Sequence, residues 1–404
     1  MVKDSKKNNW QTKKLSEVCD FSRGLTYSKK DEVDFSDNIV LRSNNIDLKS
    51  SLLDLSDLRY INNKIIIPDN KRVRRGSIII CTANGSKSHL GKIALIDDDY
   101  EYAFGGFMGQ LTPKECIDSK YFFYNLNSSF YKDHLEKISS GANINNLKFS
   151  DLKDLEIPLP PLSEQHHIVK ILDEVFVDVA KAKENAGKNL QNAKELFESY
   201  LQSVFANPGK DWEEKRLGEA YDVRDGTHDS PKYQKEGYAL ITSKNLKRDE
   251  LDYQKIKYIS EKDYKKINER SKVHKGDILF AMIGTIGNPV VIKTEPDFAI
   301  KNVALFKIPK DQNSYFLKYF LDSKFVIDKM MSEAKGTTQK FVGLGYLRNF
   351  KIQLPNLDEQ KAIVAKLDTL SAETKKLETI YQQKLADLEE LKKSVLRRAF
   401  NGDL

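Results

Sequence analysis

The stretch LPPLSEQ at positions 159–165 returns as LPNLDEQ at positions 354–360. A short apolar run precedes each copy, and apolar residues at spacings of three and four follow it. Ser163 and Asp358 are residue types that cap helices, and the glutamate after each places negative charge where the helix dipole favours it. The pattern therefore predicts a strand that ends at proline and a long helix that begins beyond it, twice in one chain.

The repetition extends beyond this motif, at an offset of about 200 residues. DFSRGLTYS at 20–28 corresponds in outline to DVRDGTHDS at 222–230, and LRSNNI at 41–46 corresponds to ITSKNL at 241–246. Units of solenoid proteins are about 20 to 50 residues long, so a repeat of this length indicates two related domains in tandem. We therefore expect each half of the chain to perform the same kind of task.

Each globular half carries both strand and helix patterns. Lys64–Pro68 and Ile278–Met282 are short β-branched or apolar runs that predict strands. Tyr121–Ile138 and Tyr315–Ala334 carry aromatic and aliphatic residues at helical spacing. The predicted fold class is therefore α+β, with two tandem mixed α/β domains joined by a long coiled coil of two helices.

The two long helical segments are expected to pair with each other. Their apolar positions recur with gaps of three and four over 163–205 and again beyond position 358, as in coiled coils. Related halves usually meet about a pseudo-two-fold axis, which makes two such helices antiparallel. The expected boundaries are 1–158 for the first globular domain, 159–207 for the first long helix, 208–353 for the second domain and 354–404 for the second helix.

Composition limits the class of protein. The 404 residues carry a net charge of +7, which is mild for a nucleic-acid binder, and solvated helix faces account for most of the 66 lysines and arginines. No apolar run is long enough for a membrane span and the first ten residues are polar, so we expect a cytoplasmic protein without membrane contact. Cys19, Cys81 and Cys116 form no CxxC pair and are predicted to be buried thiols.

Motifs for catalysis or metal binding are incomplete throughout the sequence. GSKSHLGKI at 85–93 has the wrong spacing for a phosphate-binding loop and is expected to be a polar turn. FGGFMG at 104–109 lacks the strand–turn–helix context of a cofactor site, so its glycine pattern is attributed to chance. His166 and His167 should lie on a helix surface, and Asp97–Asp99 in a solvated loop. The chain is therefore predicted to be non-catalytic, with no metal site and no cofactor of its own.

Polar loops rich in residues that read base edges recur in both halves. Arginine suits guanine and asparagine suits adenine in the major groove, while lysine and arginine also contact phosphates. Shared turn geometry could also retain such loops, and this alternative stays open. The candidate DNA-contacting residues are Arg23, Thr26, Tyr27, Lys29, Arg42, Asn44, Asn45, Asn143 and Asn145 in the first half, and Arg224, Thr227, His228, Lys232, Tyr233, Ser243, Lys244, Asn245, Gln339 and Lys340 in the second.

The chain resembles the DNA-specificity subunit of type I restriction-modification enzymes. The resemblance spans nearly the whole length and rests on the two helix openings, on LKKSVLRRAFNGDL at 391–404 and on the DGTH…PKY loop at 225–233. It implies that each domain is a target-recognition domain that reads one part of a split site in double-stranded DNA, and that the helices form an antiparallel spacer. Because the loops at 24–27 and 226–229 differ, we expect the site to be asymmetric. GLTYSKK at 24–30 stands where the family pattern has a DGTH-type loop.

The resemblance also implies partners. Two methyltransferase subunits, which carry S-adenosylmethionine, would dock on the helices, with Glu164, Gln165, Glu359 and Gln360 as candidate docking residues. Motor-nuclease subunits that use ATP and Mg would be further partners, and a methylation-only system without them is the alternative. A stand-alone nuclease with fused specificity domains and a coiled-coil scaffold that does not bind DNA are the rival classes. Salt-dependent binding to random duplex would separate a DNA-binding protein from the scaffold.

Overall fold

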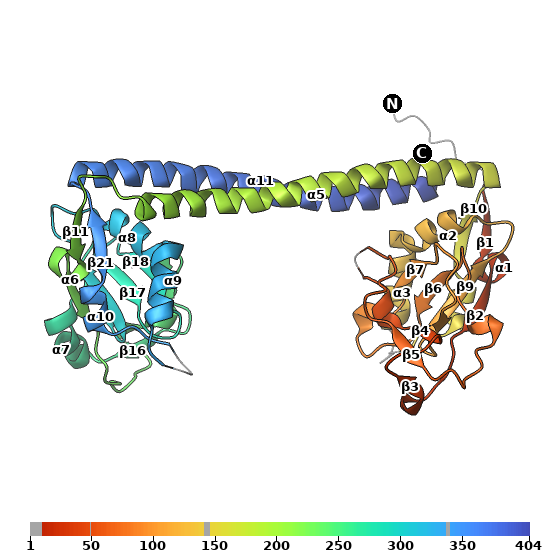
Figure 1. The fold of residues 1–404 in the computed structure, drawn as a ribbon, viewed down its shortest axis with the longest axis horizontal. Helices are drawn as coiled ribbons and strands as arrows, with labels where there is room; N and C mark the ends of the chain where they lie inside the picture. The colour runs from red at the N-terminus through yellow and green to blue at the C-terminus, as the bar shows by residue number, and fades with distance from the viewer. Residues whose placement is uncertain (1–9, 49, 141–145, 337–339) are drawn as a thin grey trace. The chain divides into compact units, whose positions relative to one another are not determined.

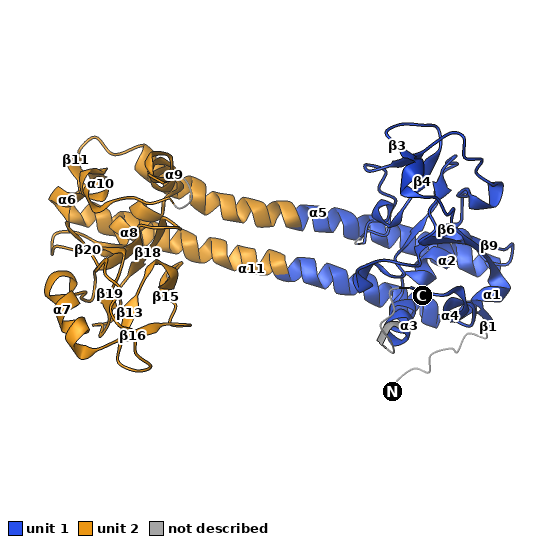
Figure 2. Cartoon of the chain, turned by 90° about the horizontal axis from the view of Figure 1, so that it is seen from below, with its two compact units in different colours: residues 1–186, 383–404 blue, residues 187–382 orange. Residues whose placement is uncertain are grey.

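The structure is a computed structural model in which residues 10–48, 50–140, 146–336 and 340–404 are described. The chain divides into two compact units (Figure 2). Unit 1 contains residues 1–186 and 383–404, and unit 2 contains residues 187–382. Each unit therefore combines one globular repeat with one end of each of the two long helices.

Unit 1 is an α+β domain built from short strands and helices (Figure 1). Its strands are β1 (Gln11–Lys14), β2 (Cys19–Arg23), β3 (Glu32–Val33), β4 (Ile39–Leu41), β5 (Arg59–Ile61), β6 (Ile78–Cys81), β7 (Ile93–Leu95), β8 (Ala103–Phe104), β9 (Met108–Pro113) and β10 (Glu156–Leu159). Its shorter helices are α1 (Leu15–Val18), α2 (Ser119–Leu126), α3 (Ser129–Ser140) and α4 (Phe149–Lys153).

Unit 2 repeats this architecture and adds one helix, α7, after its β16 strand (Figure 1). Its strands are β11 (Glu213–Arg216), β12 (Asp222–Asp225), β13 (Tyr238–Ile241), β14 (Leu246–Lys247), β15 (Glu250–Leu251), β16 (Lys257–Ile259), β17 (Ile278–Ala281), β18 (Gly287–Val291), β19 (Ala299–Ile300), β20 (Val303–Lys307) and β21 (Lys351–Leu354). Its shorter helices are α6 (Leu217–Ala220), α7 (Glu261–Ser271), α8 (Ser314–Asp322), α9 (Lys324–Glu333) and α10 (Leu344–Asn349).

The two units share one sheet topology. The central antiparallel sheet has the order β2-β9-β6-β7 in unit 1 and the corresponding order β12-β20-β17-β18 in unit 2. A neighbouring sheet contains one parallel pair in each unit, β4 with β8 and β13 with β19. A two-stranded ladder, β1 with β10 or β11 with β21, precedes each long helix. The repeat in the sequence is therefore a repeat of fold, as predicted.

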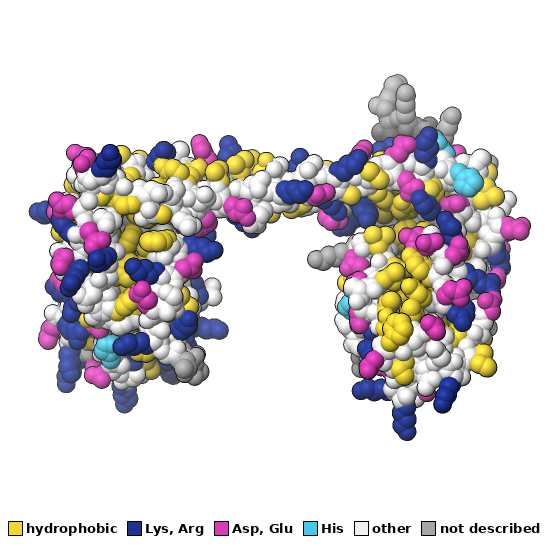
Figure 3. Space-filling view, in the orientation of Figure 1, with side chains coloured by type: hydrophobic (Ala, Val, Ile, Leu, Met, Phe, Trp, Pro, Cys, Tyr) yellow, Lys and Arg dark blue, Asp and Glu magenta, His cyan; other side chains and the backbone are white. Residues whose placement is uncertain are grey.

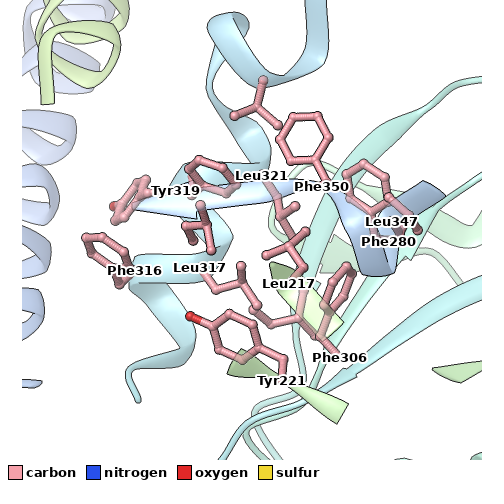
Figure 4. Close-up of a cluster of buried hydrophobic side chains, with 14 of the residues drawn as sticks. Leu217, Tyr221, Phe280, Phe306, Phe316, Leu317, Tyr319, Leu321, Leu347 and Phe350 are labelled. Atoms are coloured by element: carbon pink, nitrogen blue, oxygen red, sulfur yellow. The ribbon is translucent and has the colours of Figure 1, made fainter. Parts of the chain in front are cut away.

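The central strands β6 and β17 each separate two hydrophobic cores. Both are buried at every position, and because successive side chains of a strand point to opposite faces, neighbouring residues enter different clusters. Phe280 lies near Leu347 and Phe350 in one cluster (Figure 4), whereas Leu279 packs on the opposite face with Leu246 and Ile300. The first face joins the sheet to the long helices, and the second supports the loops that carry the candidate DNA-contacting residues.

The strand predictions were right in unit 2 and wrong in unit 1. Ile278–Met282 contains β17, which lies in the middle of its sheet. Lys64–Pro68 is not a strand: the N–H group of Ile65 donates to the carbonyl of Asn62 at 2.9 Å, and Ile66 is 90% exposed. A β-branched run forms a strand only where a sheet can cover it, and this segment has no such neighbour.

Each of the two helices predicted in the globular halves is in fact a pair of helices. The segment Tyr121–Ile138 breaks between α2 and α3 at Asn127 and Ser128, and Tyr315–Ala334 breaks between α8 and α9 at Ser323. The apolar spacing continues across both breaks because the two short helices of each pair bury faces in the same core. Periodicity alone therefore could not locate the turn.

The long helices α5 (Leu162–Ala206) and α11 (Leu357–Asn401) contain 45 residues each. Both helices begin one residue before the predicted N-cap residues, Ser163 and Asp358. The side-chain oxygen of Asn356, rather than Asp358, accepts the N–H group of Glu359 at 3.0 Å. No helix in the described part of the chain is long and apolar enough to cross a membrane.

Within each unit the long helices run antiparallel. In unit 1, Lys183 Nζ lies 2.5 Å from Glu389 Oε1, and in unit 2 the ammonium group of Lys366 lies 5.0 Å from the ring centroid of Tyr200. As the residue number rises along α5, from Lys183 to Tyr200, the number of its partner in α11 falls, from Glu389 to Lys366. The antiparallel coiled-coil prediction is confirmed.

The C-terminal end of each long helix completes the core of a globular repeat. Phe205 of α5 packs edge-on against Phe316 of α8 in unit 2, with ring centroids 5.4 Å apart. Phe400 of α11 packs in the same way against Tyr121 of α2 in unit 1, at 5.3 Å. Aromatic contacts of this kind bury large apolar surfaces, so each helix is a structural part of both units.

The cysteines are free thiols, but only two of them are buried. Cys19 and Cys81 lie in the core of unit 1, as predicted, whereas Cys116 is exposed in the loop between β9 and α2. Burial raises the pKa of the Cys19 thiol to about 12, so this group stays protonated. The prediction that all three are buried is therefore wrong for Cys116.

Candidate nucleic-acid interface

The candidate DNA-contacting loop of each unit begins at a glycine that lies against a neighbouring strand. A Cβ atom at Gly24 would collide with the carbonyl oxygen of Gly105, and one at Gly226 would collide with that of Ile300. The N–H group of Thr227 donates to the same Ile300 carbonyl at 3.1 Å. Only glycine permits so close an approach, and it fixes where both loops leave the sheet.

A groove of about 470 Å³ in unit 1, the unit 1 groove, brings predicted residues from two loops together. Arg42 is held by Asp57, whose Oδ2 lies 3.1 Å from its Nη2. Burial raises the pKa of Tyr27, so its hydroxyl stays neutral and both donates and accepts. The lining residues are Leu25, Thr26, Tyr27, Lys29, Glu32, Arg42, Ser43, Asn44, Gly105, Gly106, Phe107 and Met108.

Arg23 lies beside a second groove of unit 1, the side groove, of about 360 Å³. Its guanidinium carbon lies 5.6 Å from the ring centroid of Phe149, and Asn146 and Phe107 line the same groove. Phe107 therefore borders both grooves of unit 1. The sequence interpretation missed this residue because FGGFMG has no counterpart in the second half.

The unit 2 groove, of about 510 Å³, occupies the corresponding place and is strongly basic. The predicted residues Tyr233, Ser243, Lys244 and Asn245 line it. Four lysines that the sequence interpretation missed also line it: Lys247, Lys255, Lys257 and Lys301. They come from different elements, since Lys257 lies in β16 whereas Lys255 lies in the preceding turn with φ of 57°, so only the fold brings them together.

The ring of Tyr233 is held at the edge of the unit 2 groove by a cation. Lys257 Nζ lies 4.1 Å from the ring centroid, and Tyr233 is 40% exposed. This contact fixes the ring while leaving one face open. Lys232, the preceding residue, is exposed.

His228 is anchored at the base of its loop. Nε2 lies 2.8 Å from Asp225 Oδ2, Nδ1 lies 2.9 Å from Asn302 Oδ1, and Arg270 pairs with the other oxygen of Asp225. The Asp225 side chain is 4% exposed and the His228 side chain 62% exposed, so an exposed ring rests on a buried carboxylate. Thr227 borders an adjacent groove of about 200 Å³ that also contains Arg270.

Arg224 is committed to contacts within unit 2. Its guanidinium donates two hydrogen bonds to Asp222 Oδ2, at 2.9 and 2.6 Å, and a third to the carbonyl of Arg270 at 3.0 Å. The hydrogen bonds to Asp222 raise the pKa of Arg224 above its ordinary value. A direct base contact would need these bonds to break.

The amides of Asn45 and Asn245 are hydrogen-bonded within their own turns. Asn45 is fully buried, and its side chain accepts from the N–H group of Arg42 at 2.8 Å and donates to the carbonyls of Asp54 and Asp57. Asn245 makes the equivalent bonds in unit 2, accepting from Thr242. Both shape the turns that carry Asn44 and Lys244. We therefore withdraw Asn45, which is fully buried, whereas Asn245 lines the unit 2 groove and stays a candidate contact.

Three candidate residues, Asn143, Asn145 and Gln339, lie outside the described residues. Lys340, at the edge of that gap in unit 2, is exposed, and its ammonium group donates to the carbonyl of Met331 at 3.0 Å. Basic side chains gather at the end of unit 1 that carries β3 and β5, and at the end of unit 2 that carries β16 and α7 (Figure 3).

The glutamines of the helix openings join each long helix to its domain. Gln165 and Gln360 are fully buried. The Gln165 side chain accepts the N–H group of Asp118 at 2.8 Å and donates to the carbonyl of Pro160 at 2.8 Å. Gln360 does the same with Asn313 and the carbonyl of Pro355, at 2.9 and 2.8 Å. Their buried amides cannot meet a partner directly, so we withdraw both from the docking residues.

The glutamates of the helix openings are partly exposed. Glu164 and Glu359 both have intermediate exposure, and Glu359 Oε1 accepts the indole N–H group of Trp212 at 2.8 Å. His166 and His167 are exposed on the surface of α5, as predicted. The side chains that remain available near the start of each long helix are therefore charged or polar.

The sequence model of one family, described as type I restriction modification DNA specificity domain, matches the chain twice, over residues 7–186 and 209–387. The chain belongs to this family. The two matches coincide with the two repeats, so this specificity subunit of a type I restriction-modification system carries two DNA-recognition domains. The family assignment agrees with the resemblance seen in the helix openings and in the DGTH…PKY loop.

Two characterised relatives match this specificity subunit over almost its whole length. The type I restriction enzyme EcoKI specificity subunit of Escherichia coli strain K12 is 26% identical over 98% of this chain and 89% of its own. The StySPI specificity subunit of Salmonella potsdam is 26% identical over the same shares of the two chains.

Solved structures share the fold of this subunit. A chain described under complex assembly and conformational transition of the type I R-M system has a TM-score of 0.76 at 22% identity, over 98% of this chain and 99% of that one. The HsdS subunit from Thermoanaerobacter tengcongensis has a TM-score of 0.68 at 20% identity, over 98% of both chains. At these identities the likeness establishes the fold.

Proposed function

We propose that each unit of this specificity subunit reads one half of a bipartite, asymmetric DNA site, and that α5 and α11 set the spacing and dock methyltransferase subunits. The observation that carries the proposal is the pair of grooves, which occupy equivalent places in the two repeats and have different linings. Two domains with the same fold should dock on a duplex in related ways, and the different side chains of their grooves should select different bases.

The chemistry of the grooves supports a division of labour within each half-site. Lysines such as Lys247 and Lys255 suit phosphates, which fix the register of the protein on the duplex. Arg42 and Asn44 in unit 1, and Ser243 and Lys244 in unit 2, carry donors and acceptors that suit base edges in the major groove. We infer that Tyr233 and His228 belong to the same base-reading set in unit 2.

The catalytic steps are proposed to lie in partner subunits. Methyltransferase subunits would supply S-adenosylmethionine, and motor-nuclease subunits, where present, would supply ATP and Mg chemistry. A methylation-only system is the second candidate. The purified chain is then expected to bind DNA without methylating or cutting it, and to gain methylation activity when its cognate methyltransferase subunit is added.

Salt dependence and methylome sequencing test the proposal. DNA affinity should fall steeply between about 50 and 200 mM salt, because each phosphate contact releases condensed counterions. Cells that express the chain with its methyltransferase subunit should carry one split methylated motif. Affinity that is insensitive to salt, or methylation without a sequence motif, would refute the proposal and favour a scaffold.

The basic lining of the unit 2 groove gives a sharper prediction. Replacing Lys247 and Lys255 together by alanine should reduce the slope of log affinity against log salt by about 2, since each lysine at a phosphate contributes roughly 1. The recognised motif should stay the same. The control is the pair Lys215 and Lys351, which lie on the β11–β21 ladder and bind Glu213 and Glu214. Equal effects of both pairs would contradict the assignment of the groove.

A further inference from the structure

Phe107 is an exposed aromatic residue on a rigid turn. The turn joins β8 to β9, and its hydrogen bond from the N–H group of Met108 to the carbonyl of Gly105 is 2.8 Å long, which makes Gly106 and Phe107 its central residues. The carbonyl of Phe107 accepts two hydrogen bonds, from the N–H group of Thr82 at 2.9 Å and from that of Ala83 at 3.1 Å. The backbone is therefore fixed while 73% of the residue is exposed.

The same turn is joined to both loops that line the unit 1 groove. The N–H group of Leu25 donates to the carbonyl of Phe104 at 2.7 Å, just before Thr26, and that of Gly105 donates to Leu41 at 2.9 Å, just before Arg42. Phe107 lies between the unit 1 groove and the side groove and lines both. Phe107 is therefore an exposed aromatic residue shared by two grooves that also contain Arg23, Lys29 and Arg42.

The scaffold does not require an aromatic residue at this place. The equivalent turn of unit 2, between β19 and β20, carries Lys301 and Asn302, and the N–H group of Lys301 donates to the carbonyl of Ile241 at 2.8 Å, as Gly105 does to Leu41. A side chain that is 73% exposed contributes little to the core. The fold therefore does not explain why unit 1 has an aromatic residue in this turn, and a contact with the ligand would explain it.

We propose that Phe107 contacts the 5-methyl group of a thymine in the major groove of the half-site read by unit 1. The inference rests on the proposed function and specifies one apolar group, a thymine methyl, in the half-site that unit 1 reads. The thymine methyl is the apolar group that the major groove exposes, and an aromatic ring held by its backbone loses little conformational freedom on meeting it. Lys29, in the same groove, supplies positive charge for a flanking phosphate, while Arg42 faces the neighbouring base edges.

The test replaces each thymine of the unit 1 half-site, on either strand, by deoxyuridine, which lacks only the methyl group. The full chain with its methyltransferase subunits is titrated with these duplexes, first as the natural protein and then as Phe107→Ala. One substitution should weaken binding by the natural protein about fourfold, the worth of one buried methyl-sized group. The same substitution should leave binding by Phe107→Ala unchanged.

Phe130→Ala is the matched control, since Phe130 of α3 is also exposed, at 54%, and does not line either groove. It should retain the full effect of the deoxyuridine substitution. The proposal is overturned if no thymine shows the effect, if Phe107→Ala retains it, or if the half-site contains no thymine. If the natural protein bound random duplex as tightly as its natural site, the proposed function itself would be refuted.

Discussion

At the scale of single residues, the two repeats place the same side chain in the same bonds. Gln165 and Gln360 stand 195 positions apart, and each takes one backbone N–H group and gives its amide to a proline carbonyl. Because both are fully buried, an alanine in either place leaves polar backbone groups without partners. The glutamine of the LPPLSEQ and LPNLDEQ motifs therefore recurs because it joins each long helix to its domain.

Gln165→Ala is predicted to lower the stability of unit 1 by about 1 to 3 kcal/mol, the cost of leaving buried hydrogen-bonding groups unpaired. Hydrogen exchange should then speed up in α2 and at the start of α5, with little change in α8. Gln360→Ala should show the reverse pattern and serves as the matched control. Equal effects of one variant on both α2 and α8 would contradict this assignment.

A second prediction contrasts two glycines. Gly24→Ala should distort the start of the unit 1 loop, because its Cβ would meet the carbonyl of Gly105, and binding of the corresponding half-site should be lost. Gly187→Ala should instead stabilise α5 by about 0.5 to 1 kcal/mol, since a Cβ there meets nothing within 4 Å. Methylome sequencing and thermal unfolding would measure the two effects. A Gly24→Ala protein with the natural motif would contradict the first.

At the scale of elements, the turn between β14 and β15 joins the unit 2 groove to its helices. Asp249, at the turn, lies 2.6 Å from Lys318 of α8, and Arg248 lies 3.7 Å from Glu198 of α5. The equivalent turn of unit 1 uses a neutral bond, from Ser51 to Asn127 at 2.9 Å. Asp249 and Ser51 both adopt left-handed backbone conformations, with φ of 67° and 58°.

The charged turn gives a pH prediction for unit 2. Burial acts to raise the pKa of Asp249, but the hydrogen bond and charge of Lys318 outweigh it and hold the pKa below its ordinary value. A lowered pKa in the folded state stabilises the turn at higher pH, and this contribution is lost as pH falls below about 4 through the folded value. Amide NMR shifts of β14 and β15 should report the loss, and Asp249→Asn should abolish it. A matching titration at Ser51 would contradict the assignment.

The sequence predicted the elements that depend on local pattern better than those that depend on neighbours. The long helices and β17 were found because their periodicity and burial agree over their length. The breaks at Ser128 and Ser323 were missed because both helices of each pair bury faces in one core.

The part of the candidate site that depends on local sequence pattern was also predictable. Loops marked by glycine and asparagine lie at the grooves, but the sequence could not tell that Asn45 is consumed by its own turn while Asn44 is exposed. Phe107 and Lys301 reach the grooves only through β8 and β19, which pair with β4 and β13 from distant positions. Such parallel pairing leaves no local mark in the sequence.

At the scale of the whole molecule, each long helix contributes residues to both units, and the proposal that its length sets the gap between the half-sites can be tested. Four residues inserted after Ala186 in α5 and four after Gln382 in α11 lie where the chain divides into its units. They add about 6 Å and about 40° beyond one helical turn, since a helix rises 1.5 Å per residue with 3.6 residues per turn. One or two base pairs, at about 3.4 Å each, match this displacement.

The double insertion is therefore predicted to lengthen the gap between the two half-sites by one or two base pairs while both half-sites keep their bases. Methylome sequencing of cells that express the variant with its methyltransferase subunit measures both quantities at once. Four residues inserted at Asp98, in the exposed loop 97–99, are the control and should leave the spacing as it is. An unchanged gap in the helix variant would mean that α5 and α11 do not set it, whereas altered bases in either half-site would mean that the grooves are not independent of helix length.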